Sequence, residues 1–264
     1  MEYAQLNNGV RMPMIGYGTY RTPQRNAERL VSDALQIGYR HIDTAQCYGN
    51  ESGVGAALAN SGITRDELFV TTKTWTSNYA DTARSIEASL QALRCDYVDL
   101  LIIHEPSGDI PGIYRALEDA YTQGKARAIG VSNFVGRDFD ELVRSASVTP
   151  AIDQVETHVL RQQTQLQARC RNAGVLLTSW SPLIAGRGTR ASNELLESIA
   201  AAHGKTASQV ALRWLVQRGI PVIPKSTNEQ HMRENLDIFD FELDAREMSR
   251  IASLDTGKSQ FNWW

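Results

Sequence analysis

The segment RHIDTAQCYGNESGVGAALANSG, residues 40–62, contains the smallest unit from which this chain is built. Its first part is a short apolar run, which is typical of a buried strand, and its second part has the apolar spacing of a helix. Gly62 closes the expected helix, because glycine readily adopts the left-handed conformation that ends a helix. The segment is therefore predicted to form a strand, a loop and a helix.

The same order recurs along the chain. Expected strands cover residues 14–20, 40–45, 67–73, 97–104, 126–133, 151–156, 174–182 and 220–226. Expected helices cover residues 26–38, 51–62, 82–94, 112–124, 138–147, 164–174, 192–204, 207–219 and 229–238. Strands alternating with helices of this size form β-α-β units with parallel strands. Eight units in about 250 residues predict an α/β fold of the (β/α)8 TIM-barrel type.

Residues 3–16 precede the first unit and carry an Asn-Gly turn signal between two short apolar stretches. This pattern predicts a β-hairpin that closes the floor of the barrel. The rival fold, a doubly wound sheet, requires a third glycine in a phosphate-binding fingerprint after the first strand. Gly16 and Gly18 have no such partner, so we expect a single barrel domain over residues 1–264.

Composition limits the classes of function. The chain has a net charge of −3 and is 42% hydrophobic, which argues against nucleic acid or an anionic membrane surface as a partner. It contains no run of about 18 apolar residues and no signal-peptide pattern. Cys47, Cys95 and Cys170 are far apart, so we expect reduced thiols in a cytoplasmic protein, without a disulfide or metal framework. No large apolar stripe suggests a subunit interface, so we expect a monomer.

The ends of the predicted strands carry the chemistry, because the active site of a (β/α)8 barrel lies at the carboxyl ends of its strands. Asp43, Lys73 and His104 end three of them, and Tyr48 lies in the loop after Asp43. Each also has an ordinary interpretation: a helix cap, a solvated charge, a core histidine and a half-buried loop aromatic. Their joint occurrence at one rim favours a catalytic site. No second ligand stands near His104, so no metal is expected.

Five segments resemble the signature sequences of the aldo-keto reductase superfamily, especially its small bacterial members of the 2,5-diketo-D-gluconate reductase type. They are DTAQCYGNE, TTKTW, IIHEP, RAIGVSNF and IPKSTNEQHMREN, and the resemblance extends from about residue 5 to residue 255. It implies a (β/α)8 barrel that binds NADPH, with some use of NADH. The implied reaction is reversible hydride transfer between nicotinamide and a small aldehyde, ketone or dicarbonyl.

The resemblance places the catalytic residues at Asp43, Tyr48, Lys73 and His104. Tyr48 would be the general acid that protonates the carbonyl oxygen, and a neighbouring Lys73 ammonium would lower its pKa. Asp43 would keep Lys73 charged and in place, because a buried ammonium without a partner is costly. His104 would orient the carbonyl oxygen toward Tyr48.

The resemblance also implies a set of residues around the cofactor. Ser132, Asn133 and Gln154 would hold the carboxamide, and Trp180 would stack on the nicotinamide. Lys225 would hold the adenosine phosphate with its neighbours at a helix N-terminus. The full expected set is Thr19, Ser132, Asn133, Gln154, Trp180, Ser181, Leu183, Lys225, Ser226, Thr227, His231, Glu234 and Asn235, with Tyr20, Trp75 and Glu105 expected at the substrate.

Two positions depart from the family pattern. Glu105 stands where the family usually has Trp, and it would either face the pocket and repel anionic substrates or point to solvent. His231 stands where an Arg usually grips the 2′-phosphate, and a histidine is charged only part of the time near pH 7. It would weaken the NADPH preference, unless it is merely a surface helix residue.

The C-terminal tail is short. Phe261, Trp263 and Trp264 would either cover the pocket or pack on the barrel wall.

A binding or regulatory module is the alternative function, since the superfamily includes ion-channel subunits with this barrel. The complete catalytic tetrad favours the enzyme. Cofactor binding without turnover of any aldehyde would support the module.

Overall fold

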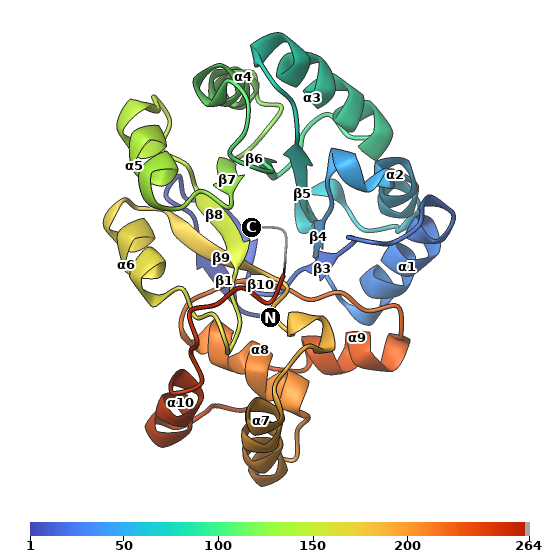
Figure 1. The fold of residues 1–264 in the computed structure, drawn as a ribbon. Helices are drawn as coiled ribbons and strands as arrows, with labels where there is room; N and C mark the ends of the chain where they lie inside the picture. Colours follow the sequence, from blue (N-terminus) through green and yellow to red (C-terminus); the bar gives the residue numbers. More distant parts are fainter. Residues whose placement is uncertain (262–264) are drawn as a thin grey trace.

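The computed structural model describes residues 1–261. Eight parallel strands follow one another in chain order from β3 to β10, and Figure 1 shows the helices surrounding them. A parallel bridge between Ile15 and Val222 joins the two ends of this sheet, so the predicted (β/α)8 barrel is confirmed. The strands are β3 (Tyr17–Gly18), β4 (His41–Asp43), β5 (Phe69–Thr74), β6 (Leu100–Ile103), β7 (Ile129–Ser132), β8 (Ile152–Glu156), β9 (Leu176–Trp180) and β10 (Val222–Ile223).

The helices cover the outer face of the barrel. They are α1 (Gln24–Ile37), α2 (Glu51–Asn60), α3 (Tyr79–Leu93), α4 (Ile110–Thr122), α5 (Gly136–Ser145), α6 (Thr164–Asn172), α7 (Arg190–His203), α8 (Ala207–Gln217), α9 (Glu229–Leu236) and α10 (Ala245–Ala252). The expected helices correspond to α1 to α9. Helix α10, in which Ile251 is the buried residue, was not among the expected helices.

The N-terminal hairpin closes the floor of the barrel, as expected. Strand β1 (Tyr3–Gln5) pairs antiparallel with β2 (Arg11–Pro13), and Gly9 in the turn has a φ of 88°. Leu6 and Met12 pack against apolar side chains of the barrel strands in a separate small core. This packing leaves the opposite end, where the strands have their carboxyl ends, open for a site.

The register of the parallel strands brings distant polar residues to the same level. Asp43 pairs with Thr71, and Lys73, two residues further along β5, pairs with Ile102. Ser132 pairs with Gln154 on the neighbouring strands β7 and β8. Side chains on strands alternate between faces, and those of Asp43 and Lys73 meet inside the barrel.

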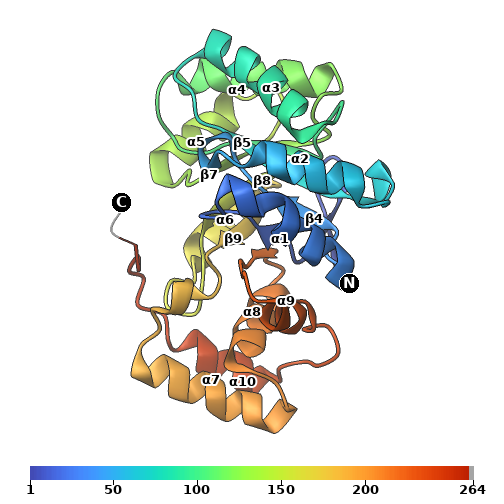
Figure 2. The same cartoon turned by 90° about the vertical axis from the view of Figure 1, so that its right-hand side faces the viewer.

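The tail after α10 returns to the mouth of the barrel (Figures 1 and 2). Glu156, at the end of β8, accepts hydrogen bonds from Ser259 Oγ at 2.6 Å and from the Gln260 backbone at 2.8 Å. Phe261 is buried, lines the mouth cavity and lies with its ring centroid 5.2 Å from that of Trp180. Covering of the pocket is therefore the correct alternative for Phe261, whereas Trp263 and Trp264 lie outside the described residues.

Candidate active site

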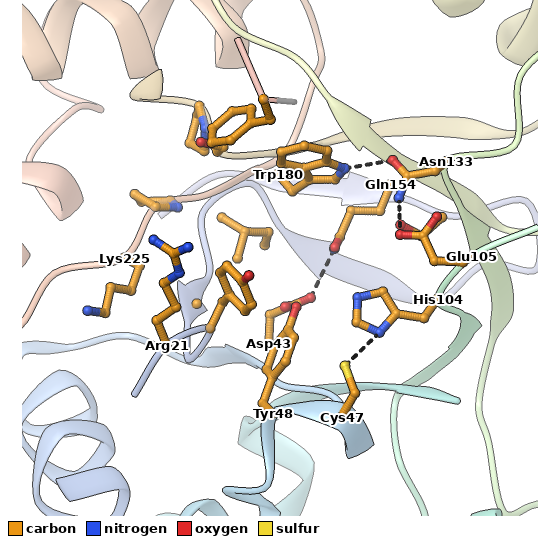
Figure 3. A pocket seen from close by; sticks show the side chains of 18 of the residues that line it. Arg21, Asp43, Cys47, Tyr48, His104, Glu105, Asn133, Gln154, Trp180 and Lys225 are labelled. Atoms are coloured by element: carbon orange, nitrogen blue, oxygen red, sulfur yellow. Dashed lines mark hydrogen bonds between the residues drawn. The ribbon is translucent and has the colours of Figure 1, made fainter. Parts of the chain in front are cut away.

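A cavity of about 880 Å³ opens at the carboxyl ends of the strands. Figure 3 shows side chains from the ends of several strands pointing into it. Among the predicted residues, its lining includes Tyr20, Asp43, Tyr48, Trp75, His104, Glu105, Ser132, Asn133, Gln154, Trp180, Ser181, Leu183 and Lys225. The structure therefore brings most of the predicted site together.

Asp43 and Lys73 form an ion pair beneath the cavity floor. Their side chains are 5% and 1% exposed, so neither charge could be kept there without partners. Lys73 Nζ also donates to the Thr44 carbonyl at 2.8 Å, and Gln154 Nε2 donates to Asp43 Oδ2 at 2.9 Å. Asp43 is thus the partner of Lys73 rather than a helix cap.

Tyr48 ends a short 3₁₀ helix, Gln46–Tyr48, that follows β4. Gly49 comes next with a φ of 64°, a left-handed conformation that glycine adopts at little cost. The buried Asn50 then fixes the loop: it accepts from Thr44 Oγ1 at 2.9 Å and donates to the Thr19 carbonyl at 3.0 Å. Sequence reasoning missed this role of Asn50.

The surroundings of Tyr48 correct one expectation. Burial raises the pKa of Tyr48 well above its usual value, and the negative charge of Asp43 acts in the same direction. Lys73 Nζ lies 5.1 Å from the ring centroid of Tyr48. The ammonium group donates to Asp43 and Thr44, so its charge is largely offset and the expected lowering of the pKa does not occur in this state.

His104 is neutral in this site. Burial, aided by the positive charge of Lys73, lowers its pKa to about 3. Cys47 Sγ lies 3.3 Å from His104 Nδ1 (Figure 3), and burial raises the pKa of this thiol. A protonated thiol facing Nδ1 favours the tautomer in which Nδ1 accepts and Nε2 carries the hydrogen. Cys47 was expected only as a reduced thiol. Its position next to Tyr48 in the sequence was the available signal that it lies at the site.

Glu105, Asn133 and Trp180 form a hydrogen-bonded chain on one wall of the cavity (Figure 3). Trp180 Nε1 donates to Asn133 Oδ1 at 2.8 Å, and Asn133 Nδ2 donates to Glu105 Oε1 at 2.9 Å. Burial raises the pKa of Glu105 to about 8, although the hydrogen bond from Asn133 opposes the shift. Glu105 therefore faces the cavity rather than solvent, but the expected carboxylate is mostly a neutral acid at pH 7.

Basic side chains line the cavity at a distance from His104. Figure 3 shows Arg21 and Lys225 together on the side opposite Glu105. Burial and the charge of Arg21 lower the pKa of Lys225. Arg187, in the loop after β9, also lines the cavity, and its guanidinium carbon lies 4.9 Å from the ring centroid of Phe261. Arg21 and Arg187 were missed, although Arg21 directly follows the predicted Tyr20.

Six predicted cofactor residues do not line the cavity: Thr19, Ser226, Thr227, His231, Glu234 and Asn235. Thr19 is buried, and its hydroxyl donates to the Asp43 carbonyl at 3.1 Å, so it fixes the end of β4. The others lie in the loop after β10 and on α9. There, Asn228 caps the helix by accepting from the His231 backbone at 3.2 Å. His231 is exposed and Asn235 is buried.

Residues 1–261 show neither a membrane-spanning helix nor a metal-binding cluster. None of the helices described there is both long and apolar enough to cross a membrane. The same residues hold no cluster of three or more His, Cys, Asp or Glu side chains that could bind a metal ion.

Comparison with known proteins identifies the family of this chain. The model of the aldo/keto reductase family matches residues 14–256. Glyoxal reductase of Bacillus subtilis is 44% identical over 255 residues, which cover 95% of this chain and 92% of that protein. Methylglyoxal reductase DkgA of Yersinia pestis is 40% identical over 257 residues, covering 96% of this chain and 93% of that protein.

A solved structure agrees with these relatives. The aldo-keto reductase of Bombyx mori, crystallised in complex with NADP, superposes with a TM-score of 0.92 at 33% identity, over 99% of this chain and 95% of that one. The barrel, the polar residues at its strand ends and the family match agree, and the chain belongs to the aldo/keto reductase family.

Proposed function

We propose that this protein reduces small aldehydes, ketones and dicarbonyls with NADPH, and that Tyr48 is the general acid. The observation that carries this proposal is the grouping of the phenol of Tyr48 with a buried Asp43–Lys73 pair and a neutral His104 at one end of the cavity. The names of the relatives, glyoxal reductase and methylglyoxal reductase, support dicarbonyls as the substrate class.

The lining of the cavity fits a nicotinamide dinucleotide. Amide and hydroxyl groups of Ser132, Asn133 and Gln154 lie at one side, where they can hold a carboxamide. Arg21 and Lys225 lie at the other, where guanidinium and ammonium groups can hold phosphates. Bound NADPH would supply a hydride to the carbonyl carbon.

Residues of the chain then orient and protonate the carbonyl oxygen of the substrate. His104 donates from Nε2 to the carbonyl oxygen and orients it, as a neutral imidazole can. Tyr48 transfers its phenolic proton to the same oxygen as negative charge develops there. The raised pKa of Tyr48 keeps this proton in place through neutral pH, so the phenol is available as an acid. Lys73, held by Asp43, lies beside the Tyr48 ring and fills the floor of this corner.

NADPH is the proposed physiological cofactor, with measurable use of NADH. Lys225 lies in the loop that is expected to hold the adenosine phosphate, and Ser226 and Thr227 follow it before α9. The exposed His231 offers less to a 2′-phosphate than the planar, permanently charged fork of an arginine would.

A substrate panel tests the proposal. Oxidation of NADPH and of NADH is followed with methylglyoxal, glyoxal, 4-nitrobenzaldehyde and a simple ketone. We expect turnover with the dicarbonyls and higher efficiency with NADPH. Tight cofactor binding without turnover of any carbonyl compound would instead support a binding module.

A further inference from the structure

The chain of hydrogen bonds on the cavity wall ends in a half-buried acid, Glu105. Trp180 and Asn133 use the indole N–H, the amide oxygen and one amide hydrogen within the chain, and Glu105 Oε1 receives the last bond. Glu105 Oε2 is buried and has no hydrogen-bond partner among residues 1–261. One oxygen of the carboxyl group therefore accepts a hydrogen bond, and the other has no partner. The charge state of the group is for this reason sensitive to what occupies the cavity.

The titratable groups around Glu105 differ from it in one respect. His104, its neighbour, stays neutral because its pKa is lowered to about 3. Cys47 and Tyr48 approach from the loop after β4, and burial raises the pKa of both. Beneath them Lys73 is paired with Asp43, and the cations Arg21, Arg187 and Lys225 line the same cavity. Among these side chains, Glu105 alone leaves a buried oxygen without a hydrogen-bond partner in residues 1–261.

We propose that Glu105 is a positioning residue for the nicotinamide end of the cofactor, and that its carboxyl group favours oxidised over reduced cofactor by charge. The proposal rests on the proposed function, in which Asn133 and Trp180 hold the carboxamide and the ring. Glu105 holds Asn133 in place by accepting from Asn133 Nδ2, and its charge acts on the ring across space without contact with the cofactor.

The physical reason is the difference between the two forms of the ring. Oxidised nicotinamide carries a positive charge, and reduced nicotinamide is neutral. A positive charge near Glu105 favours the carboxylate and lowers its pKa, so binding of NADP⁺ releases a proton from Glu105 to solvent. Binding of NADPH does not. By linkage, the affinity for NADP⁺ rises relative to that for NADPH as pH rises through the pKa of Glu105 in the free protein.

The ratio of the two dissociation constants isolates this effect, because both cofactors carry the same 2′-phosphate and its titration cancels. We expect the ratio of the NADP⁺ to the NADPH constant to fall by about tenfold between pH 6.5 and pH 9, the order expected for charges separated by several ångströms near a protein surface. Calorimetry in two buffers of different ionisation enthalpy should show proton release on NADP⁺ binding near pH 7.5. NADPH binding should show a smaller release, because only the 2′-phosphate contributes to it and Glu105 does not.

Glu105→Gln keeps the acceptor for Asn133 and removes the charge. We expect this variant to bind both cofactors with a ratio that does not change with pH, and to release the same number of protons with NADP⁺ as with NADPH. Glu51→Gln is the matched control, since Glu51 also has a pKa raised by burial but does not line the cavity; the slope of the ratio should persist in it.

A flat ratio in the wild-type protein, or an unchanged slope in Glu105→Gln, would overturn the inference. The proposed function would still stand in either case if the protein binds NADPH and reduces methylglyoxal. Failure to bind either cofactor would instead remove the proposed function, and the inference with it.

Discussion

Two regions at the carboxyl ends of the strands are built in different ways. The proposed catalytic corner (Asp43, Tyr48, Lys73 and His104) lies at the strand ends, with its charges buried and paired. The proposed phosphate rim (Lys225, Ser226, Thr227 and His231) lies in a loop and on the first turns of α9, and three of its four residues are exposed. Buried charges must be satisfied by the protein, whereas exposed ones are satisfied by water until a ligand arrives.

This difference indicates which functions the two regions can have. A corner whose groups are already fixed needs no reorganisation during the reaction, which is the condition for stabilising a transition state. A rim of exposed side chains contributes to affinity, and each of its contacts is worth less because water competes for it. Substitutions in the corner should therefore affect turnover, and substitutions in the rim should affect cofactor binding.

The largest effect is expected for Tyr48→Phe, which keeps the ring and removes the acid. Turnover of methylglyoxal should fall by ~10²- to 10⁴-fold, the usual contribution of a general acid. The dissociation constant for NADPH should change little. Steady-state kinetics and fluorescence titration measure the two quantities, and near-normal turnover in the variant would show that another group supplies the proton.

The second-largest effect is expected for removal of the buried ammonium group of Lys73. Lys73→Met leaves Asp43 without its ion-pair partner, and an uncompensated buried charge destabilises a protein by about 3–5 kcal/mol. Urea denaturation should show a loss of that order. The double variant Asp43→Asn/Lys73→Met should be more stable than Lys73→Met alone. If both lose the same stability, the pair is not the source of the effect.

The ion pair and the barrel illustrate what the sequence allows one to predict. Eight strand–helix units follow from local periodicity, and a buried lysine at a strand end requires an acid nearby. The tautomer favoured for His104 and the charge of Glu105 could not be predicted, because Cys47 and Asn133 lie 57 and 28 residues away from them. Helix α10 was missed although its sequence carries a start signal, a capping box in which Asp244 and Glu247 accept from each other's backbone.

Lys225→Met should affect binding rather than chemistry. A hydrogen bond to a charged group contributes about 1.5–3 kcal/mol, so the dissociation constant for NADPH should rise by about 10- to 100-fold. The rate constant kcat with saturating NADPH should stay within about twofold of wild type, since the reacting groups are untouched. A fall in kcat as large as the loss of affinity would place Lys225 in the catalytic corner.

Glu105 should make the choice of substrate depend on pH. Its pKa of about 8 means that it is mostly neutral at pH 7 and mostly charged at pH 9. The efficiency for a keto acid relative to a neutral aldehyde should therefore fall by about tenfold as pH rises through 8, because like charges then repel. Glu105→Gln should flatten this ratio, and an equal pH dependence in the variant would assign the effect to another group.

The smallest effect is expected for His231→Arg. Because His231 is exposed and does not line the cavity, a permanent charge there should tighten NADPH binding by about fivefold or less. NADH binding should be unchanged, since NADH lacks the 2′-phosphate. An unchanged ratio of the two dissociation constants would mean that His231 is a surface helix residue only.

The division between corner and rim is tested most directly by measuring kcat and the NADPH dissociation constant together for Tyr48→Phe and Lys225→Met. The account predicts a crossed pattern: Tyr48→Phe loses turnover with normal affinity, and Lys225→Met loses affinity with normal turnover. The result that would contradict it is a parallel loss, in which both variants lower kcat and affinity by similar factors.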